Sequence, residues 1–301
     1  MMAQIPLLLI QTAFIIALAP LVSGLIRKVK DTLRMRRGAS IFQPYYNFAK
    51  LLKKDEVVSR NSSWIFAAAP VVVLASSMAA CLLLPVFGIR VSLGVMGDML
   101  ALFFILALGR FFLALAGLDS ASAFGGMGSS REMFISSILE PAAFVSLFVL
   151  SMNCGSTATA ALAGTQALRA STVAAGAAFF MVVLAETSRI PVDNRETHLE
   201  LTMVHEAMVL EYSGRSLALI ELAGHIKQAV FFVILGWFFF PAAAGFSWRA
   251  LALCAGISVT GLAVALIEIS LAKMRLFRVV DFGSFAFFIA LLAAVFASMG
   301  M

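Results

Sequence analysis

Eight long apolar runs, each bounded by polar or charged residues, constrain what this chain can fold into. A helix that crosses a hydrocarbon layer about 30 Å thick needs roughly 20 apolar residues, and each run has about that length. The composition agrees, because 62% of the residues are hydrophobic and 13% are charged, against roughly 25% charged in a soluble domain. We therefore predict an all-α polytopic membrane protein, residues 1–301 forming one domain. The expected crossings are 5–26, 64–87, 96–117, 132–153, 166–186, 226–245, 249–271 and 279–300.

The first run is expected to remain as a helix rather than to act as a cleaved secretory signal. Signal peptides carry positive charge before the apolar run and a small-residue cleavage site after it. Here no charged residue precedes Ile5, and a basic cluster follows Ile26.

Lysine and arginine in the short loops predict the orientation, because such loops remain on the cytoplasmic side. Eight crossings place four loops on one face, and this face holds nearly all the basic residues. Both termini are therefore expected outside, in a multi-pass protein of the cell (inner) membrane. The net charge of +6 reflects this asymmetry, and no nucleic-acid-binding motif accompanies it. The loops of the cytoplasmic face are 27–63, 118–131, 187–225 and 272–278.

The first of these loops predicts an amphipathic helix in the membrane interface. From Gln43 the chain reads QPYYNFAKLLKK; Pro44 suits a first helical turn, and apolar residues recur at helical spacing beside lysines. The simpler interpretation is a basic retention loop with incidental aromatic residues. In the other interpretation the helix belongs to a partner-docking surface, to which we assign Arg36 and Arg37.

A second loop, GLDSASAFGGMGSSRE (117–132), consists mainly of glycines and small residues, which permit tight turns and close backbone approach. No Lys-Ser or Lys-Thr pair follows the glycines, as a phosphate-binding loop would require. We expect a folded loop packed against a partner protein, with Asp119 and Arg131 in the docking surface.

Several ionisable residues fall inside the apolar runs, where a charge costs roughly 2.5–3.5 kcal/mol and usually marks a pathway. Among them are Arg110, Glu140, Glu186 and Glu268. Pro141 follows Glu140 and is expected to kink its helix. Pairing with Arg110 would oppose the effect of burial on the Glu140 carboxyl, so this pair is a candidate proton-carrying site. The alternatives are a static ion pair, and, for Glu186 and Glu268, the simple end of a helix.

The stretch AETSRIPVDNRETHLELTMVHEAMVLEYSG (185–214) is unusually acidic for such a chain. Carboxylates one turn apart raise the pKa of one member when water is scarce, which suits a proton relay; an acidic solvated loop is the alternative. His198 and His205 are candidate neighbours of the relay rather than metal ligands, and Glu221, His225 and Lys227 read as interfacial anchors. The candidate relay and coupling residues are Glu140, Glu186, Asp193, Glu196, Glu200, Glu206, Glu211, Arg110 and Arg189.

In order along the chain, RRG, FAKLLKKD, GLDSASAFGGMGSSRE, ILEP, AETSRIPVDNRE and LEYSG resemble the complex I subunit 1 family, a type of membrane protein found in NADH-quinone oxidoreductases. Within it they look most like the membrane subunit of energy-converting nickel–iron hydrogenases and formate hydrogenlyases. The resemblance places Glu140 and Glu186 among buried carboxylates that lead from the redox arm into the membrane, and residues 193–211 in an acidic loop.

The resemblance implies a non-catalytic subunit of an oxidoreductase complex, which anchors the peripheral arm and helps couple electron transfer to proton or sodium translocation. Its expected partners are hydrogenase large and small subunits, an iron–sulfur protein and antiporter-like membrane subunits. Cys81, Cys154 and Cys254 form no CxxC motif or four-thiolate set. No metal or cofactor is therefore expected on this chain, and the nickel–iron centre and iron–sulfur clusters are expected on its partners.

Three other functions remain open. A quinone-reducing NADH dehydrogenase subunit would share the acidic loop and hold a quinone headgroup between the first helix and that loop. An independent ion transporter would be expected to show internal repeats or paired broken helices, and neither is visible. A passive anchor would have the same helices without any role in ion movement.

Overall fold

The structure is a computed structural model that describes residues 5–59, 62–86, 97–163, 169–194, 203–239 and 246–300. These ranges contain helices and no β-strand, which confirms the all-α prediction. The helices are α1 (Ile5–Leu33), α2 (Gln43–Leu52), α3 (Trp64–Leu82), α4 (Met99–Asp119), α5 (Ala123–Cys154), α6 (Thr159–Leu162), α7 (Ala170–Glu186), α8 (His205–Val209), α9 (Gly214–Phe239), α10 (Phe246–Ser270) and α11 (Leu276–Ser298).

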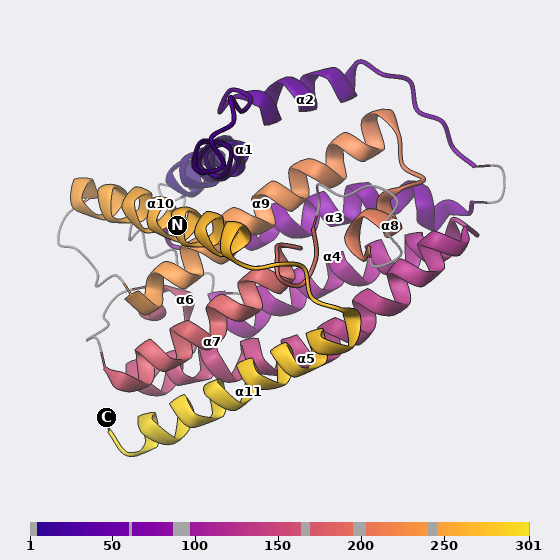
Figure 1. Ribbon diagram of the computed structural model, residues 1–301. Coiled ribbons are helices and arrows are strands. Elements are labelled where there is room, and N and C mark those ends of the chain that lie inside the picture. Colours follow the sequence, from indigo (N-terminus) through magenta and orange to yellow (C-terminus); the bar gives the residue numbers. More distant parts are fainter. Residues whose placement is uncertain are drawn as a thin grey trace.

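Each predicted apolar run corresponds to a helix in the described part of the chain. Seven of these helices are long and apolar enough to cross a membrane, so the protein is a multi-pass membrane protein. The remaining one, α7, has 17 residues and spans about 26 Å. It packs against α5, α9 and α11 (Figure 1).

Side-chain caps set where three of the crossing helices begin. An N-cap side chain accepts a hydrogen bond from one of the first free backbone N–H groups of the helix. Ser63 does so for α3, accepting from the N–H of Ile65 at 3.2 Å. Asp98 caps α4 in the same way, and Ser122 caps α5 by accepting from the N–H of Gly125 at 3.0 Å. Short polar residues thus mark the junctions that hydropathy alone leaves uncertain.

Two sequence-based boundaries are wrong because hydropathy cannot detect polar helical turns. The expected loop 117–132 is mostly helical: α4 continues to Asp119, α5 begins at Ala123, and only three residues connect them. Helix α9 begins at Gly214 rather than near residue 226. The charged residues that we assigned to interfacial anchoring, Glu221, His225 and Lys227, therefore lie within α9, where they face cavities and partners inside the protein.

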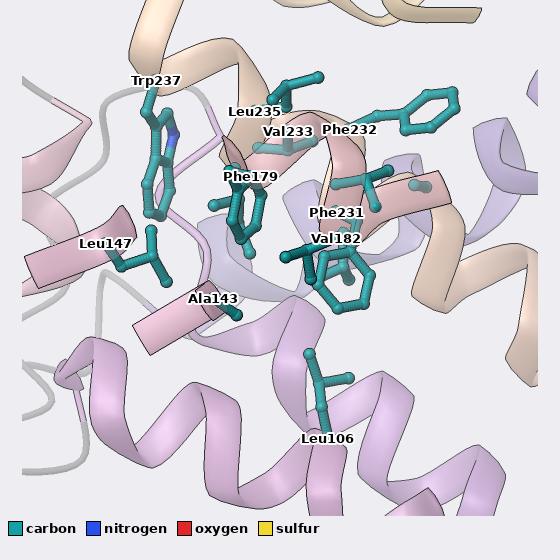
Figure 2. Close-up of a cluster of buried hydrophobic side chains, with 14 of the residues drawn as sticks. Leu106, Ala143, Leu147, Phe179, Val182, Phe231, Phe232, Val233, Leu235 and Trp237 are labelled. Carbon is teal, nitrogen blue, oxygen red and sulfur yellow. The ribbon is translucent and has the colours of Figure 1, made fainter. Parts of the chain in front are cut away.

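The core lies where α4, α5, α7 and α9 meet (Figure 2). Phe179 and Val182 of α7 face Phe231 of α9, and the rings of Phe179 and Phe231 have centroids 6.0 Å apart. Leu106 of α4 and Leu147 of α5 complete the cluster. Since lipid is as apolar as these side chains, close van der Waals packing stabilises the contact. This packing fixes the helices that carry the charged site.

The amphipathic helix predicted from Gln43 is present as α2 and has no fully buried residue. It lies outside the bundle and contacts α1 and α9 (Figure 1). The hydroxyl of Tyr45 donates to the backbone carbonyl of Ala17 in α1. Gly24 of α1 allows the chain before α2 to approach closely, because a Cβ on Gly24 would lie 1.9 Å from the carbonyl oxygen of Ile41.

Replacement of Gly24 by alanine should separate α2 from α1. We expect Gly24→Ala to lower stability by about 1–3 kcal/mol, since a backbone atom blocks the new methyl group. Gly126→Ala is the matched control, because no atom lies within 4 Å of its added Cβ and alanine favours a helix over glycine by roughly 1 kcal/mol. Thermal unfolding in detergent measures both; equal midpoints would contradict the close approach.

Candidate functional site

Arg110 joins two carboxylates from different helices inside the bundle. It projects from α4, with its side chain 9% exposed, and its Nη2 lies 2.6 Å from Oε1 of Glu140 on α5. Its Nη1 forms a second ion pair with Oε1 of Glu186, the last residue of α7. The Arg110–Glu140 pairing expected from the sequence is thus confirmed, and Glu186 belongs to the same cluster.

Lys227 and Glu132 complete this group, which we call the Arg110 cluster (Arg110, Glu132, Glu140, Glu186 and Lys227). The ammonium of Lys227, on α9, lies 2.8 Å from Oε2 of Glu186. Glu132, on α5, lies within the electrostatic reach of both Lys227 and Arg110. With all five groups ionised, three carboxylates face two cations, so the cluster carries one excess negative charge. It can therefore hold one additional proton without leaving a cation uncompensated.

Sequence reasoning missed Glu132 and misjudged Lys227. Glu132 lay at the junction between the expected loop 117–132 and the expected crossing 132–153, and Lys227 lay at the start of the expected crossing 226–245. The signal available was helical spacing: Glu132 precedes Glu140 by eight residues, which places both near one face of a continuous helix. That signal becomes visible only once α5 is extended to Ala123.

A small cavity of about 50 Å³ adjoins the Arg110 cluster. Arg110, Glu132, Glu186 and Lys227 line it together with His205 of α8. A site with roughly 10–15 Å³ of such volume and several polar partners is large enough for a water molecule. The cavity is thus suited to hold water between a histidine and the charged side chains of the cluster.

Asp193 organises the acidic segment instead of facing the membrane. Its Oδ2 accepts hydrogen bonds from the backbone N–H groups of Val204 (3.3 Å) and His205 (3.1 Å), at the start of α8. Its Oδ1 lies 3.1 Å from the ammonium of Lys273, in the α10–α11 connection. The carboxylate therefore fixes the position of His205 beside the small cavity.

A second charged group, the Glu268 cluster (Lys30, Arg189 and Glu268), joins α1 and α10 to the turn after α7. The carboxylate of Glu268 lies 3.3 Å from Nζ of Lys30 and 3.1 Å from Nη1 of Arg189. The side chains of Lys30 and Glu268 are only 3% and 4% exposed. Arg189 also donates to Oε1 of Gln228 at 3.1 Å. Glu268 is therefore part of a buried network, and not the simple end of a helix.

A large cavity of about 540 Å³ lies between α1, α2, α8 and α9. Lys30 and Arg189 of the Glu268 cluster line it, as does Glu206. His205, Ile220 and Gly224 line both this cavity and the small one. A wall containing His205 thus separates the large cavity from the Arg110 cluster.

The remaining candidate residues belong to neither charged cluster. Glu211 is exposed, while Glu196 and Glu200 lie outside the described residues, as does His198. Arg36 lines the large cavity, and Arg37 is exposed.

Asp119 and Arg131 lie on helices rather than on a loop, and each makes contacts within the chain. The carboxylate of Asp119 accepts from the backbone N–H groups of Ser63 and Phe66 at the start of α3. Arg131 donates to the carbonyl of Met203 at 3.2 Å. A role for either residue in docking stays a prediction.

Comparison with known proteins shows the family of the chain. The model of the family described as NADH dehydrogenase matches residues 5–299. Hydrogenase-4 component C of Escherichia coli (strain K12) is 33% identical over 304 residues, which cover 97% of this chain and 96% of that protein. The chain belongs to the NADH dehydrogenase family. Formate hydrogenlyase subunit 4 of the same organism is 31% identical, covering 95% and 98% of the two chains.

Two further matches have lower sequence identity. An NADH-quinone oxidoreductase subunit of Rubrobacter xylanophilus is 29% identical, covering 68% of this chain and 65% of that protein. A chain in the structure of an archaeal respiratory membrane complex, the membrane-bound sulfane sulfur reductase, shares the fold with a TM-score of 0.82 at 16% identity. That alignment covers 96% of this chain and 99% of the solved one.

The LEYSG motif, which contributed to the family resemblance, has a structural role in this member. Tyr212 stacks on Phe66 with ring centroids 4.0 Å apart and donates its hydroxyl to the Phe66 carbonyl at 2.9 Å. Burial raises the pKa of Tyr212, so the phenol keeps the proton that it donates. Gly214 has φ +52°, and a Cβ there would lie 2.6 Å from the carbonyl oxygen of Asp55. The motif ties the start of α9 to α3 and to the segment before it.

Arg110 should be required for stability as well as for the charge balance of its cluster. Removal of one member of a buried ion pair costs roughly 3–5 kcal/mol, because the other charge stays buried. We expect Arg110→Gln to lower the thermal midpoint in detergent strongly and Arg110→Gln/Glu186→Gln to recover part of the loss. Arg278→Gln, an exposed arginine of α11, is the control. A loss no greater than that of Arg278→Gln would contradict the geometry.

Proposed function

We propose that this chain is an integral-membrane subunit of a multisubunit nickel–iron hydrogenase of the formate hydrogenlyase type. The observation that carries the proposal is similarity along the whole length: the two relatives named as hydrogenase-4 and formate hydrogenlyase components match over at least 95% of this chain. The relative from an NADH-quinone oxidoreductase matches over 68%. In this proposal the chain anchors the peripheral hydrogenase and iron–sulfur arm.

Coupling of electron transfer to proton or sodium translocation is the second part of the proposal. The large cavity, the wall with His205, the small cavity and the Arg110 cluster form a polar sequence from one end of the bundle to Glu140. The two cavities share wall residues, and histidine exchanges protons near neutral pH. Glu132 and Glu186 then connect His205 to Glu140. In this scheme Asp193 and Arg189 position the turn that carries the path.

Glu140 supports the inference that another membrane subunit covers the side of the bundle. Its side chain is 37% exposed within a membrane-spanning helix, where a carboxylate facing lipid would cost several kcal/mol. An antiporter-like membrane subunit that covers this face would provide polar partners and continue the path. The end of the bundle with both cavities would then face the cytoplasm and the hydrogenase subunits, with both chain termini outside the inner membrane.

Nickel–iron and iron–sulfur centres belong on partner subunits in this proposal. The described residues contain no group of three or more His, Cys, Asp or Glu side chains placed to hold a metal ion. Cys81, Cys154 and Cys254 lie on α3, α5 and α10. In this proposal the residues of this chain move ions and hold the arm in place.

Purification of the complex through a tag on this chain tests the proposed identity. We expect nickel, iron and a hydrogenase large subunit to co-purify, together with hydrogen-evolving or hydrogen-oxidising activity. Mass spectrometry and metal analysis identify them. Recovery with flavin and NADH-oxidising subunits would favour the quinone-reducing alternative, which the NADH-quinone oxidoreductase relatives support more weakly. Recovery of the chain alone would leave an independent transporter.

The coupling path predicts a selective defect. Glu140→Gln and Glu132→Gln should leave the complex assembled but reduce ion movement per hydrogen turned over, because an amide cannot carry the proton. Ion uptake and hydrogen turnover in sealed vesicles provide the two readouts. Asp55→Asn, at an exposed carboxylate in the connection between α2 and α3, is the control. Wild-type ion movement in both glutamine variants would refute the relay without affecting the assignment of the complex.

A further inference from the structure

The lining of the large cavity carries more positive charge than the carboxylate of Glu268 neutralises. Five cationic side chains line the cavity, against three carboxylates, those of Asp31, Glu206 and Glu221. With these eight groups ionised, the lining carries an excess of two positive charges, of which one is balanced by the buried carboxylate of Glu268, which pairs with Lys30 and Arg189. The cations come from the end of α1, the segment after it and the turn after α7; they are Arg27, Lys30, Arg34, Arg36 and Arg189.

Several of these donors remain available for a ligand. Among the described residues, no side-chain hydrogen bond or ion pair engages Arg27, Arg34 or Arg36. The Nε of Arg189 is buried and has no acceptor within the described part of the chain. A guanidinium group presents parallel N–H donors that match the oxygens of a phosphate. The lining is thus equipped for an anionic, oxygen-rich group.

The position of the cavity favours a lipid as the source of that group. Arg27 directly follows the apolar part of α1, and α2, which lies along the cavity, is an amphipathic helix. Both features belong to the headgroup region of a bilayer. Part of the lining is apolar and includes Pro44, Leu217 and Ile220. A free anion would leave these apolar residues facing water, whereas the glycerol and first acyl carbons of a lipid would cover them.

We propose that the large cavity binds the phosphate headgroup of an anionic phospholipid. Basic pockets between membrane helices on the cytoplasmic side are suited to such headgroups, and a volume of about 540 Å³ lies within the range of ligand sites, roughly 300–1,000 Å³. Arg27 and Arg34 hold the phosphate oxygens, and Leu217 and Ile220 contact the apolar part. A neutral headgroup or ligand would leave the excess positive charge of the lining uncompensated. This site does not depend on the identity of the redox partner.

The test uses the purified complex after removal of bound lipid. It is titrated separately with short-chain phosphatidylglycerol, short-chain phosphatidylcholine and inorganic phosphate. Native mass spectrometry counts bound lipid, and thermal unfolding gives the apparent affinity. The variant is Arg27→Gln/Arg34→Gln. The control is Arg275→Gln/Arg278→Gln, which removes the same charge from exposed arginines at the start of α11, outside the cavity lining.

Phosphatidylglycerol should bind and raise the unfolding midpoint more than phosphatidylcholine or phosphate does. Each juxtamembrane arginine contributes on the order of 1 kcal/mol toward an anionic headgroup, so the cavity variant should lose roughly 30-fold in apparent affinity. The control should retain wild-type affinity. Equal loss in both variants, equal binding of phosphatidylcholine, full stabilisation by phosphate alone, or a quinone retained in place of phospholipid would each overturn the proposal.

Discussion

The arrangement of α4, α5 and α7 around the site depends on the guanidinium group of Arg110. Arg110 is nearly buried inside a membrane bundle, where an unpaired charge is costly, and it contacts carboxylates on both α5 and α7. The fork of an arginine can satisfy two acceptors at once, which a lysine ammonium does less specifically. Small residues permit close packing beside it, since a Cβ on Gly109 would lie 2.2 Å from the hydroxyl of Ser76 on α3. The ion pairs therefore require the helices to approach closely, and the close packing holds the charged groups within contact distance.

Two buried clusters of opposite charge lie on either side of the wall formed by His205, Ile220 and Gly224. The Arg110 cluster has one carboxylate in excess, and the Glu268 cluster has one cation in excess. Asp193 and the connection between α10 and α11 hold the segment that carries His205 between them. A change in charge on either side would therefore alter the electrostatic surroundings of His205, which lines both cavities.

The sequence was sufficient to predict the parts of the fold that follow from hydropathy alone. Apolar runs located every crossing helix, and the cost of buried charge identified Arg110, Glu140, Glu186 and Glu268 as unusual. It was insufficient where polar residues continue a helix, so the start of α5, and Glu132 with it, was missed. Lys227 was misread for the same reason at α9. The association of Glu268 with Lys30 and Arg189 joins segments that are distant in sequence, and no local pattern predicts such a contact.

The position of the carboxyl end of α7 inside the bundle has an electrostatic consequence. Its backbone dipoles sum to a partial negative charge at the carboxyl end, where Glu186 adds a full charge. Because α7 is enclosed by α5, α9 and α11, bulk water and salt have little access to screen this field. Arg110 and Lys227, which both contact Glu186, therefore compensate a helix terminus as well as a carboxylate. Neutralising Glu186 would leave these two cations still attracted to the end of α7.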